Sequence, residues 1–577
     1  MHLITLTALA AVAAVSQTRF FPLSEVRAGM RGVGKTVFAG DRIEEFQVEI
    51  LGVLENVGPR QSVILARLAG GPLADTGVMQ GMSGSPVYLG GRLAGAVALA
   101  FPYAKEPLCG IRPIEEMLRI DSAPPAQTLA RSLDPLWQET AAPRDARWLD
   151  SSRLVDIATP VSFSGFTTST IDHFAPRLKA IGLEPRQGVS GGGRPASGPA
   201  ALEPGAMISV QLLSGDLSAG ADGTVTHVDG RRVYAFGHRF LSIGETQMPF
   251  ARSEVLTLLP SLSSSFKIAA PRQWAGVVTQ DRSTAIAGDL GRRAEMVPVR
   301  LAVTGPGRRT DYQMEMVNDR FLSPFLLQMA VYSAIDATEK ATGGATFRLR
   351  GQIEFQNAPS PVKLDTMYAG DYGAPAQASL GVAVPVSFAL QSGFADLKLR
   401  SVSVSVEAFE TKKQVQIERV FPARAAVRPG ETVDLYVAMA GDGGREITRR
   451  VSYTVPAGAA PGPLYFTVAD GATINFTDYR NLAATPARSP AQVISLLNNL
   501  RGNTSAWLRV WRAEQNYQVQ GEDLPSPPPS VALILNKAQA SMGALPLARA
   551  SRVDEKEIPL GDMLVSGSRT VQVEIKE

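Results

Sequence analysis

The residues best suited to chemistry form one short segment, Gly81-Met82-Ser83-Gly84-Ser85-Pro86. Glycines bracket Ser83, so the backbone can turn sharply there and leave the hydroxyl clear of the chain. The same turn can direct the backbone N–H groups of Gly81 and Ser83 at one point, which is what an oxyanion hole requires. The local composition is equally typical of a glycine- and serine-rich approach to a β-hairpin, so both interpretations stay open at this point.

A serine nucleophile needs a base, and the sequence has only four histidines: His2, His173, His227 and His238. His227 falls inside an expected strand, where an ordinary exposed or packed histidine is the better interpretation. His238 follows Gly237 at the point where a strand is expected to end, and a side chain there can reach out of a barrel wall. Taken alone, a histidine in that place is more often structural than catalytic.

Two other glycine-rich segments imitate functional loops, but their surroundings argue against both. Residues 29–36, GMRGVGKT, have the spacing of a phosphate-binding loop, which works only between a strand and a helix whose N-terminus holds the phosphates. Residues 37–41 instead predict a strand and a turn, so we expect no nucleotide there. A second serine between glycines, in residues 188–193, continues into a Gly/Pro/Ser-rich stretch that is typical of a flexible linker.

Length and composition limit the class of protein. A chain of 577 residues predicts about three to five domains, and its 53 glycines and 40 prolines indicate many short strands joined by turns. A net charge of +3 without a basic block gives no support for nucleic-acid binding. Cys109 is the only cysteine, which rules out an internal disulfide and a cysteine-based metal cluster. No other metal-ligand spacing is present, so we expect neither a metal nor a cofactor.

The first residues predict export. Residues 3–15 are apolar and alanine-rich, and Ala14-Val15-Ser16 offers the small side chains that a signal peptidase recognises. We therefore interpret residues 1–16 as a signal peptide, although no Lys or Arg precedes the apolar run. No later segment reaches about 18 uninterrupted apolar residues, so we expect no transmembrane span in the mature chain. The predicted location is secreted, periplasmic or in the cell envelope.

The surroundings of Ser83 predict strand after strand, in a module over residues 17–120. Residues 46–51 alternate apolar and polar, as a half-buried strand does. Residues 87–97 read as a hairpin directly after the serine motif, and residues 113–118 as a short helix.

A connector over residues 121–200, with a small β/α region and the glycine-rich linker, is expected before the next β module. That module, residues 201–305, contains a hairpin predicted by Asp229-Gly230 between two alternating runs. The hairpin's second strand leads to His238.

The rest of the chain shows no clustered histidine or carboxylate. Residues 306–410 predict a mixed β/α region, with a helix that begins at Ser323 as N-cap and runs to about residue 338. Residues 411–577 predict a β-sandwich of the immunoglobulin-like kind, interrupted by one helix over residues 489–501 that Ser489 caps.

Two stretches together resemble the SpoIVB-type sporulation serine peptidases. The first is residues 46–97, with the letters QGMSGSP and the return strand GRLAGAV; the second is residues 223–238, with GTVT and YAFGH. In that family the matching serine is the nucleophile and the matching histidine the general base, so the resemblance implies these roles for Ser83 and His238. It also implies a chymotrypsin-like pair of small β-barrels with the site in the cleft between them.

This sequence departs from the family in two ways. The sporulation members place the histidine before the serine, whereas here Ser83 comes first; a triad depends on geometry and not on chain order. The family's acidic residue lies on the segment before the serine motif, and here the nearest carboxylate is Asp75, which is displaced toward the serine. Asp75, Asp41 or Asp222 would have to orient the imidazole, or a Ser-His dyad works slowly, or the site is inactive.

The sequence therefore predicts an exported serine endopeptidase of SpoIVB type that acts on a protein or peptide, either processing itself or accepting few substrates. The alternative is a catalytically inactive envelope protein that keeps the peptidase fold for binding a partner or for structure.

Overall fold

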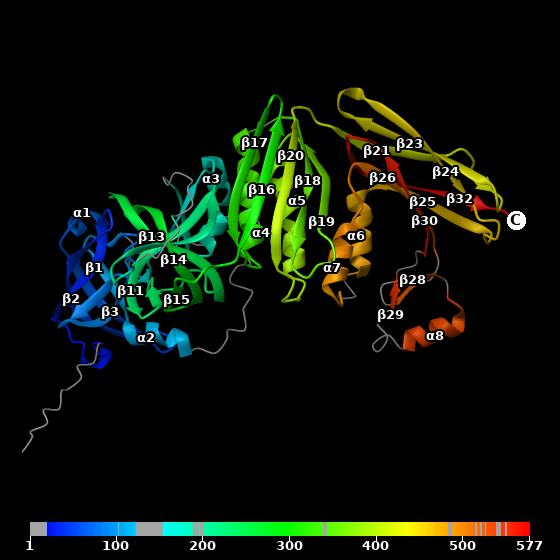
Figure 1. The fold of residues 1–577 in the computed structure, drawn as a ribbon. Helices are drawn as coiled ribbons and strands as arrows, with labels where there is room; N and C mark the ends of the chain where they lie inside the picture. The colour runs from blue at the N-terminus through cyan, green and yellow to red at the C-terminus, as the bar shows by residue number, and fades with distance from the viewer. Residues whose placement is uncertain are drawn as a thin grey trace, which may run out of the picture. The chain divides into compact units, whose positions relative to one another are not determined.

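The structure is a computed structural model in which strands predominate (Figure 1). It describes residues 20–101, 103–122, 154–188, 196, 201–262, 264–338, 343–482, 487–513, 516–519, 522–525, 527–537, 544–547 and 551–577. The predicted signal peptide lies outside these residues, as do Ser190 and most of the predicted connector. The chain divides into two compact units, one of residues 1–164, 175–212 and 218–294, the other of residues 165–174, 213–217 and 295–577.

The first unit begins with a closed six-stranded barrel. Its strands pair in the order β4-β1-β2-β3-β6-β5, and an additional pairing of β4 with β5 completes the ring. Phe46, Val48 and Ile50 of β2 are buried in its core, which confirms the predicted half-buried strand. The strands are β1 (Arg31–Ala39), β2 (Arg42–Gly58), β3 (Gln61–Ala69), β4 (Pro86–Leu89), β5 (Arg92–Ala100) and β6 (Leu108–Pro113), with helices α1 (Leu73–Thr76) and α2 (Ile114–Leu118).

A second six-stranded barrel completes this unit. The order β10-β13-β14-β15-β12-β11 is closed by an additional pairing of β10 with β11, so the mainly β, double-barrel fold that the resemblance implies is confirmed. The strands are β10 (Met207–Gly215), β11 (Ser218–Asp229), β12 (Arg232–Ala235), β13 (Gly244–Leu259), β14 (Phe266–Arg282) and β15 (Ala285–Leu290). Three further strands lie at the sheet edges: β7 (Val155–Asp156) beside β5, and β8 (Thr159–Ser164) and β9 (Leu183–Gln187) beyond β11.

The segment with phosphate-loop spacing is part of the first barrel. Residues 31–36 belong to β1, which continues to Ala39 and pairs with β2 and β4. A phosphate loop needs its backbone N–H groups free at the start of a helix. Here the segment lies in a strand with neighbours on both sides, as the residues that follow it predict.

The second unit contains a five-stranded sheet with two helices on one face (Figure 1). Its strands lie in the order β19-β18-β20-β16-β17. The elements are β16 (Met296–Gly305), β17 (Arg308–Val317), α4 (Leu322–Thr338), β18 (Ala345–Phe355), β19 (Val362–Gly370), α5 (Ala374–Leu390) and β20 (Leu399–Phe409). Helix α3 (Thr168–Ala180) starts in this unit's segment 165–174 and ends in the first unit.

The start of α4 differs from the prediction. Ser323 lies inside the helix, where its hydroxyl donates to the carbonyl of Val317. The carboxylate of Asp319 instead accepts from the N–H groups of Phe321 and Leu322, at 2.9 and 2.8 Å. A charged acceptor makes the stronger cap, so the helix begins earlier than Ser323-Pro324 indicates.

Two sheets near the C-terminus pack around one core, as a sandwich does. Their strand orders are β24-β23-β21-β31 and β22-β32-β25-β26-β30, and both sheets supply residues to the same buried cluster. The immunoglobulin-like type of sandwich stays a prediction. The strands are β21 (Gln414–Pro422), β22 (Ala426–Val427), β23 (Thr432–Gly441), β24 (Glu446–Thr454), β25 (Gly462–Asp470), β26 (Ser505–Arg512), β30 (Ser551–Pro559), β31 (Leu564–Ser566) and β32 (Ser568–Ile575).

The remaining elements join or flank the sandwich. They are α6 (Gly471–Leu482), α7 (Pro490–Asn498), β27 (Asn516–Val519), β28 (Glu522–Pro525), α8 (Pro529–Lys537) and β29 (Ala544–Leu547). Ser489 caps α7 as predicted, accepting from the N–H of Gln492. Within the described ranges, no helix combines the length and the apolar character needed to cross a bilayer.

The two barrels of the first unit approach each other closely at Gly84. A Cβ atom there would lie 2.0 Å from the carbonyl oxygen of Thr224 and 2.6 Å from the backbone nitrogen of Phe236. Gly84 also has a φ of 92°, which L side chains rarely adopt. Only glycine lets the backbone of the first barrel reach the second at this point.

We expect Gly84→Ala to lower the free energy of unfolding of the first unit by about 2–4 kcal/mol, because it adds both a clash and backbone strain. Gly90→Ala is the matched control: Gly90 also has a positive φ, of 53°, but nothing lies within 4 Å of its Cβ position. That variant should lose about 1 kcal/mol. Urea unfolding curves compare the two, and equal losses would contradict the close approach.

Candidate active site

Ser83 lies on a tight turn between α1 and β4. The flanking Gly81 and Gly84 have φ angles of 90° and 92°. The side chain of Ser83 is fully buried, and its Oγ has no hydrogen-bond partner in the described part of the chain. Among the described residues, no backbone carbonyl accepts from the N–H of Gly81 or Ser83. Both predicted oxyanion donors therefore lack a competing backbone acceptor.

Strand β11 of the second barrel holds this turn. The N–H of Thr224 donates to the carbonyl of Ser83 at 2.8 Å. The hydroxyl of Thr224 donates to the carbonyl of Gly81 at 2.9 Å, and that of Thr226 to the carbonyl of Gly84 at 2.7 Å. Three buried carbonyls are thus satisfied, so the threonines of the GTVT motif fix the backbone around Ser83.

His238 follows β12 and reaches the same place from the second barrel. At the preceding Gly237, a Cβ would lie 3.0 Å from the Cβ of Ala98 on β5. The serine turn contacts β5 at Val97, the residue before Ala98, since the N–H of Gly84 donates to its carbonyl at 2.8 Å. The structure therefore brings the two sequence-predicted segments together on one short stretch of β5.

The ring of His238 is held in one tautomer. Its Nδ1 lies 2.6 Å from the carbonyl oxygen of Arg239, and because a carbonyl only accepts, Nδ1 carries the proton. The neutral ring then has a lone pair on Nε2, which is buried and without a partner among the described residues. No hydrogen bond joins it to Ser83 Oγ, since that atom has no partner either.

Burial keeps this ring neutral. It lowers the pKa of His238, because the surroundings penalise the charged imidazolium; Asp156 partly opposes this and Arg112 adds to it. His238 is only 1% exposed. A neutral imidazole with a bare Nε2 is the form that can accept a proton from a serine.

Among the described residues, no carboxylate bonds to the ring. Asp75 is exposed on α1, and Asp41 is exposed and pairs with Arg252 at 2.8 Å. Asp222 is buried, where desolvation raises its pKa to about 7, and it accepts from the hydroxyl of Ser162 at 3.3 Å. Within the part of the chain that the structure describes, the ring of His238 makes one hydrogen bond, with the carbonyl of Arg239.

The carboxylate of Asp281 bonds to the backbone of the loop that follows His238. Asp281 of β14 is fully buried and accepts from the N–H groups of Phe240, Leu241 and Ile243 at 2.9, 2.7 and 3.4 Å. Burial raises its pKa to about 6, against the lowering effect of these bonds. Asp281 therefore fixes the loop that follows His238. Sequence reasoning missed it, because an aspartate at the end of a long strand carries no local signal of such a role.

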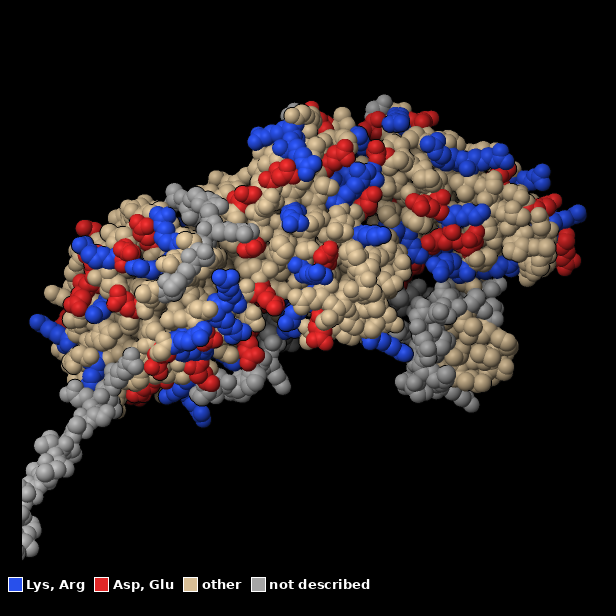
Figure 2. All heavy atoms as spheres, in the orientation of Figure 1, with Lys and Arg blue, Asp and Glu red and all other residues tan. Residues whose placement is uncertain are grey.

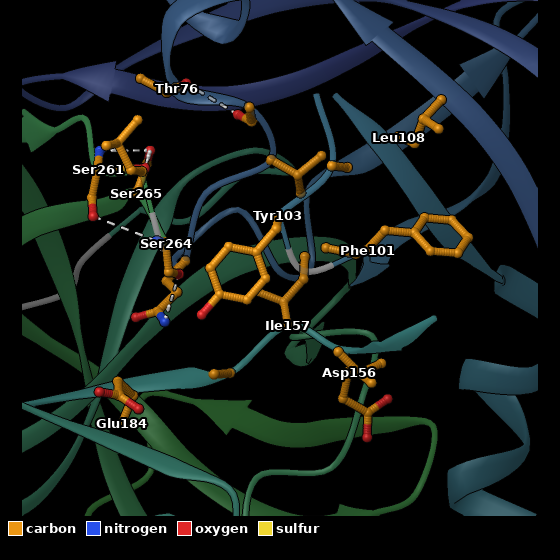
Figure 3. Close-up of a pocket in the computed structure, with 18 of the residues that line it drawn as sticks. Thr76, Phe101, Tyr103, Leu108, Asp156, Ile157, Glu184, Ser261, Ser264 and Ser265 are labelled. Carbon is orange, nitrogen blue, oxygen red and sulfur yellow. Dashed lines mark hydrogen bonds between the residues drawn. The ribbon is translucent and has the colours of Figure 1, made fainter. Parts of the chain in front are cut away.

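A cavity of about 380 Å³ lies beside the serine turn. Val78 and Gln80, just before the turn, line it on one side, and Asp156, which acts on the charge of His238, lines another. Figure 3 shows the ring of Tyr103 projecting into its middle. The Gln80 amide donates to Ser264 at 3.0 Å, while its Oε1 is buried without a partner in the described chain. An entering donor can satisfy that oxygen.

On the face of the molecule in Figure 2, basic and acidic side chains of the described residues are interspersed. No three His, Cys, Asp or Glu side chains in the described ranges are grouped so that they could hold a metal ion.

Comparison with known proteins finds one family. Residues 16–118 match the family SpoIVB peptidase S55, which confirms the resemblance for this part of the chain and supports a serine peptidase. The matched segment includes the first barrel and Ser83, while His238 lies beyond it. No curated protein and no solved structure matches the chain.

We expect Asp281→Asn to lower the free energy of unfolding by about 3 kcal/mol, because an amide accepts on only one side and places an NH₂ against backbone donors. Asp41→Asn, which removes an exposed ion pair, should cost less than about 1 kcal/mol. Urea unfolding of both variants tests this, and similar losses would contradict the role of Asp281.

The same residue predicts a pH dependence. The pKa of Asp281 is about 6 in the folded protein against 3.8 for a free aspartate side chain, so between these values the folded state holds more protons. Its contribution to stability therefore falls as the pH rises from about 4 to about 6. Unfolding curves of Asp281→Asn across this range should lack that part of the slope.

Proposed function

We propose that the chain is an exported serine endopeptidase of SpoIVB type, in which Ser83 is the nucleophile and His238 the general base. One observation carries the proposal: two buried atoms, Ser83 Oγ and His238 Nε2, lack partners on two turns that meet at Val97. Unsatisfied buried polar atoms are rare and expensive, so a pair of them at one place calls for a function. The match to the peptidase family and the predicted signal peptide support the same proposal.

The chemistry follows from the donors and acceptors present. Nε2 of His238 takes the proton from Ser83 Oγ as the oxygen attacks a peptide carbonyl carbon. The N–H groups of Gly81 and Ser83 stabilise the oxyanion, and the imidazolium returns the proton to the leaving amine. Water then releases the acyl group by the same route in reverse.

The Arg239 carbonyl supports only part of this cycle. It fixes the tautomer of His238, as the acid of a triad does, but it brings no negative charge to stabilise the imidazolium. We therefore expect slow turnover. Because Ser83 is fully buried and His238 nearly so, a substrate reaches them only after the covering segments move. Both features favour self-processing or a narrow choice of substrate.

The cavity beside the turn supplies a place for substrate side chains. Apolar residues line much of it, and the unpartnered Oε1 of Gln80 would accept from a substrate N–H. We expect Ala158→Trp, which fills the cavity, to lower peptide turnover by about tenfold or more. Labelling of Ser83 by a small probe should change by less than about threefold in that variant. Parallel loss of both would contradict a substrate role for the cavity.

A second candidate function is a non-catalytic envelope protein that binds a partner through the peptidase fold. The complete burial of Ser83 and the absence of a carboxylate bond to the His238 ring favour it.

Labelling with a serine-reactive fluorophosphonate separates the two functions. We expect the wild-type chain to be labelled, Ser83→Ala not at all, and His238→Gln at a rate lower by about 10³-fold or more. Ser190→Ala, at the other serine between glycines, is the control and should label like the wild type. Equal labelling of wild type and Ser83→Ala would refute the nucleophile. Absence of labelling in the wild type, even on long incubation, would support the binding protein.

A further inference from the structure

A lysine is buried directly behind the serine turn. Lys267, the second residue of β14, is only 1% exposed, and no carboxylate in the described chain pairs with it. A lysine without a counter-ion is among the least favourable groups to bury. Its place next to the site therefore needs an explanation that packing does not give.

The amine of Lys267 starts a chain of hydrogen bonds that ends in the serine motif. Its Nζ lies 2.7 Å from Oγ1 of Thr36 on β1. Ser85, two residues after Ser83, bonds to the same oxygen at 3.1 Å. All three side chains are buried, at 1% exposure or less. The chain thus links β14, β1 and the turn.

The backbone and the stem of Lys267 also hold the start of the turn. Its N–H donates to the carbonyl of Gln80 at 3.2 Å, and the N–H of Gln80 donates to the carbonyl of Ser265 at 2.9 Å. A Cβ on Gly81 would lie 3.3 Å from Cδ of Lys267. Lys267 therefore contacts the turn directly before Ser83 and is linked to it after Ser83 through Thr36 and Ser85.

We propose that Lys267 is a positioning residue for Ser83: its amine, through Thr36 and Ser85, fixes the turn that presents the nucleophile. The inference rests on the proposed function for its catalytic meaning, whereas its effect on stability is independent of it.

The protonation state of the amine changes how many of its donors are satisfied. Lys267 Nζ and the hydroxyl of Ser85 both donate to Oγ1 of Thr36. An uncharged amine that donates one N–H to Thr36 leaves one N–H without a partner in the described surroundings, whereas an ammonium leaves two and adds a buried charge. The uncharged form therefore fits this position, and with it the bonded turn, better than the charged form.

Burial favours that form near neutral pH. It lowers the pKa of Lys267 to about 7, and no charged group contributes to the shift. The elements packed against the amine present Thr36 and the ring of Phe38 from β1, with the ring centre 6.0 Å from Nζ, and Gly81 and Ser85 from the turn. None of these titrates in this range, so acidification acts on Lys267 itself.

The stability of the protein should report this directly. The pKa of Lys267 is about 7 in the folded state against 10.5 for a free lysine side chain, so between these values the unfolded chain binds the additional proton. The free energy of unfolding therefore rises with pH from about 7 to about 10, and Lys267 contributes no slope below about 7.

The test combines labelling and unfolding in the full chain. Wild-type fluorophosphonate labelling should rise with pH through a midpoint near 7. In Lys267→Met the rate at pH 8.5 should fall about tenfold, and the midpoint near 7 should be lost. Lys267→Arg, which stays charged, should label slowly at every pH. Thr36→Ser should retain wild-type behaviour and Thr36→Val should reproduce the loss seen in Lys267→Met.

Lys35→Met is the matched control, since Lys35 is a partly exposed lysine on β1 that pairs with Glu45, and it should behave like the wild type. A lower rate in Lys267→Met with the midpoint still near 7 would reduce Lys267 to a packing role and overturn the proposal. So would an unfolding temperature that rises between pH 7 and 10 equally in wild type and Lys267→Met. A further outcome is that the wild type is never labelled while Lys267→Met loses the rise of stability with pH between 7 and 10. In that case the peptidase proposal fails and the link from Lys267 to the turn stands.

Discussion

The site depends on how closely two backbones approach at Gly84. No side chain fits between this residue and β11, so the turn that carries Ser83 lies directly against the second barrel. Its carbonyls lose water there, and the hydroxyls of Thr224 and Thr226 replace it. Because the turn is bound to β11 on one side and to β5 on the other, Ser83 and His238 are placed by the same few strands. The geometry of the pair therefore follows from the packing of the barrels.

Several ionisable groups lie in the interior around this contact. Lys267, Asp281, Asp222 and His238 are all buried, and burial shifts the pKa of each toward the neutral form. Each such group costs stability unless it is fully bonded, which is why they are scarce in interiors that serve only folding. Their concentration in one unit, together with the unpartnered Ser83 Oγ and His238 Nε2, is the pattern of a site that gives up stability for function.

The sequence predicts the local parts of this site well. Glycine-containing turns identify the hairpins on either side of Gly90-Gly91 and at Asp229-Gly230, and the serine motif stands out by composition. The prediction that the Ser83 turn and His238 lie together came from the resemblance to a peptidase family. The spacing of the two residues in the sequence did not indicate it. The roles of Asp281 and Lys267 were not predictable, since Lys267 bonds to a residue 231 positions away. At Ser323 a local signal was misleading. The residue type is that of an N-cap, but the carboxylate of Asp319 caps the helix instead.

Each barrel is closed by its own strand pairing, and in the described part of the chain between them β7 and β8 pair with β5 and β11 without entering either ring. The site is assembled from one turn of each barrel, so it does not matter which barrel is made first. In the proposed peptidase, a serine-first chain can therefore place these two residues together as well as a histidine-first chain can. It also makes the two barrels separable: produced as two polypeptides, they keep every hydrogen bond that seats the turn, and the site would then form only on their association.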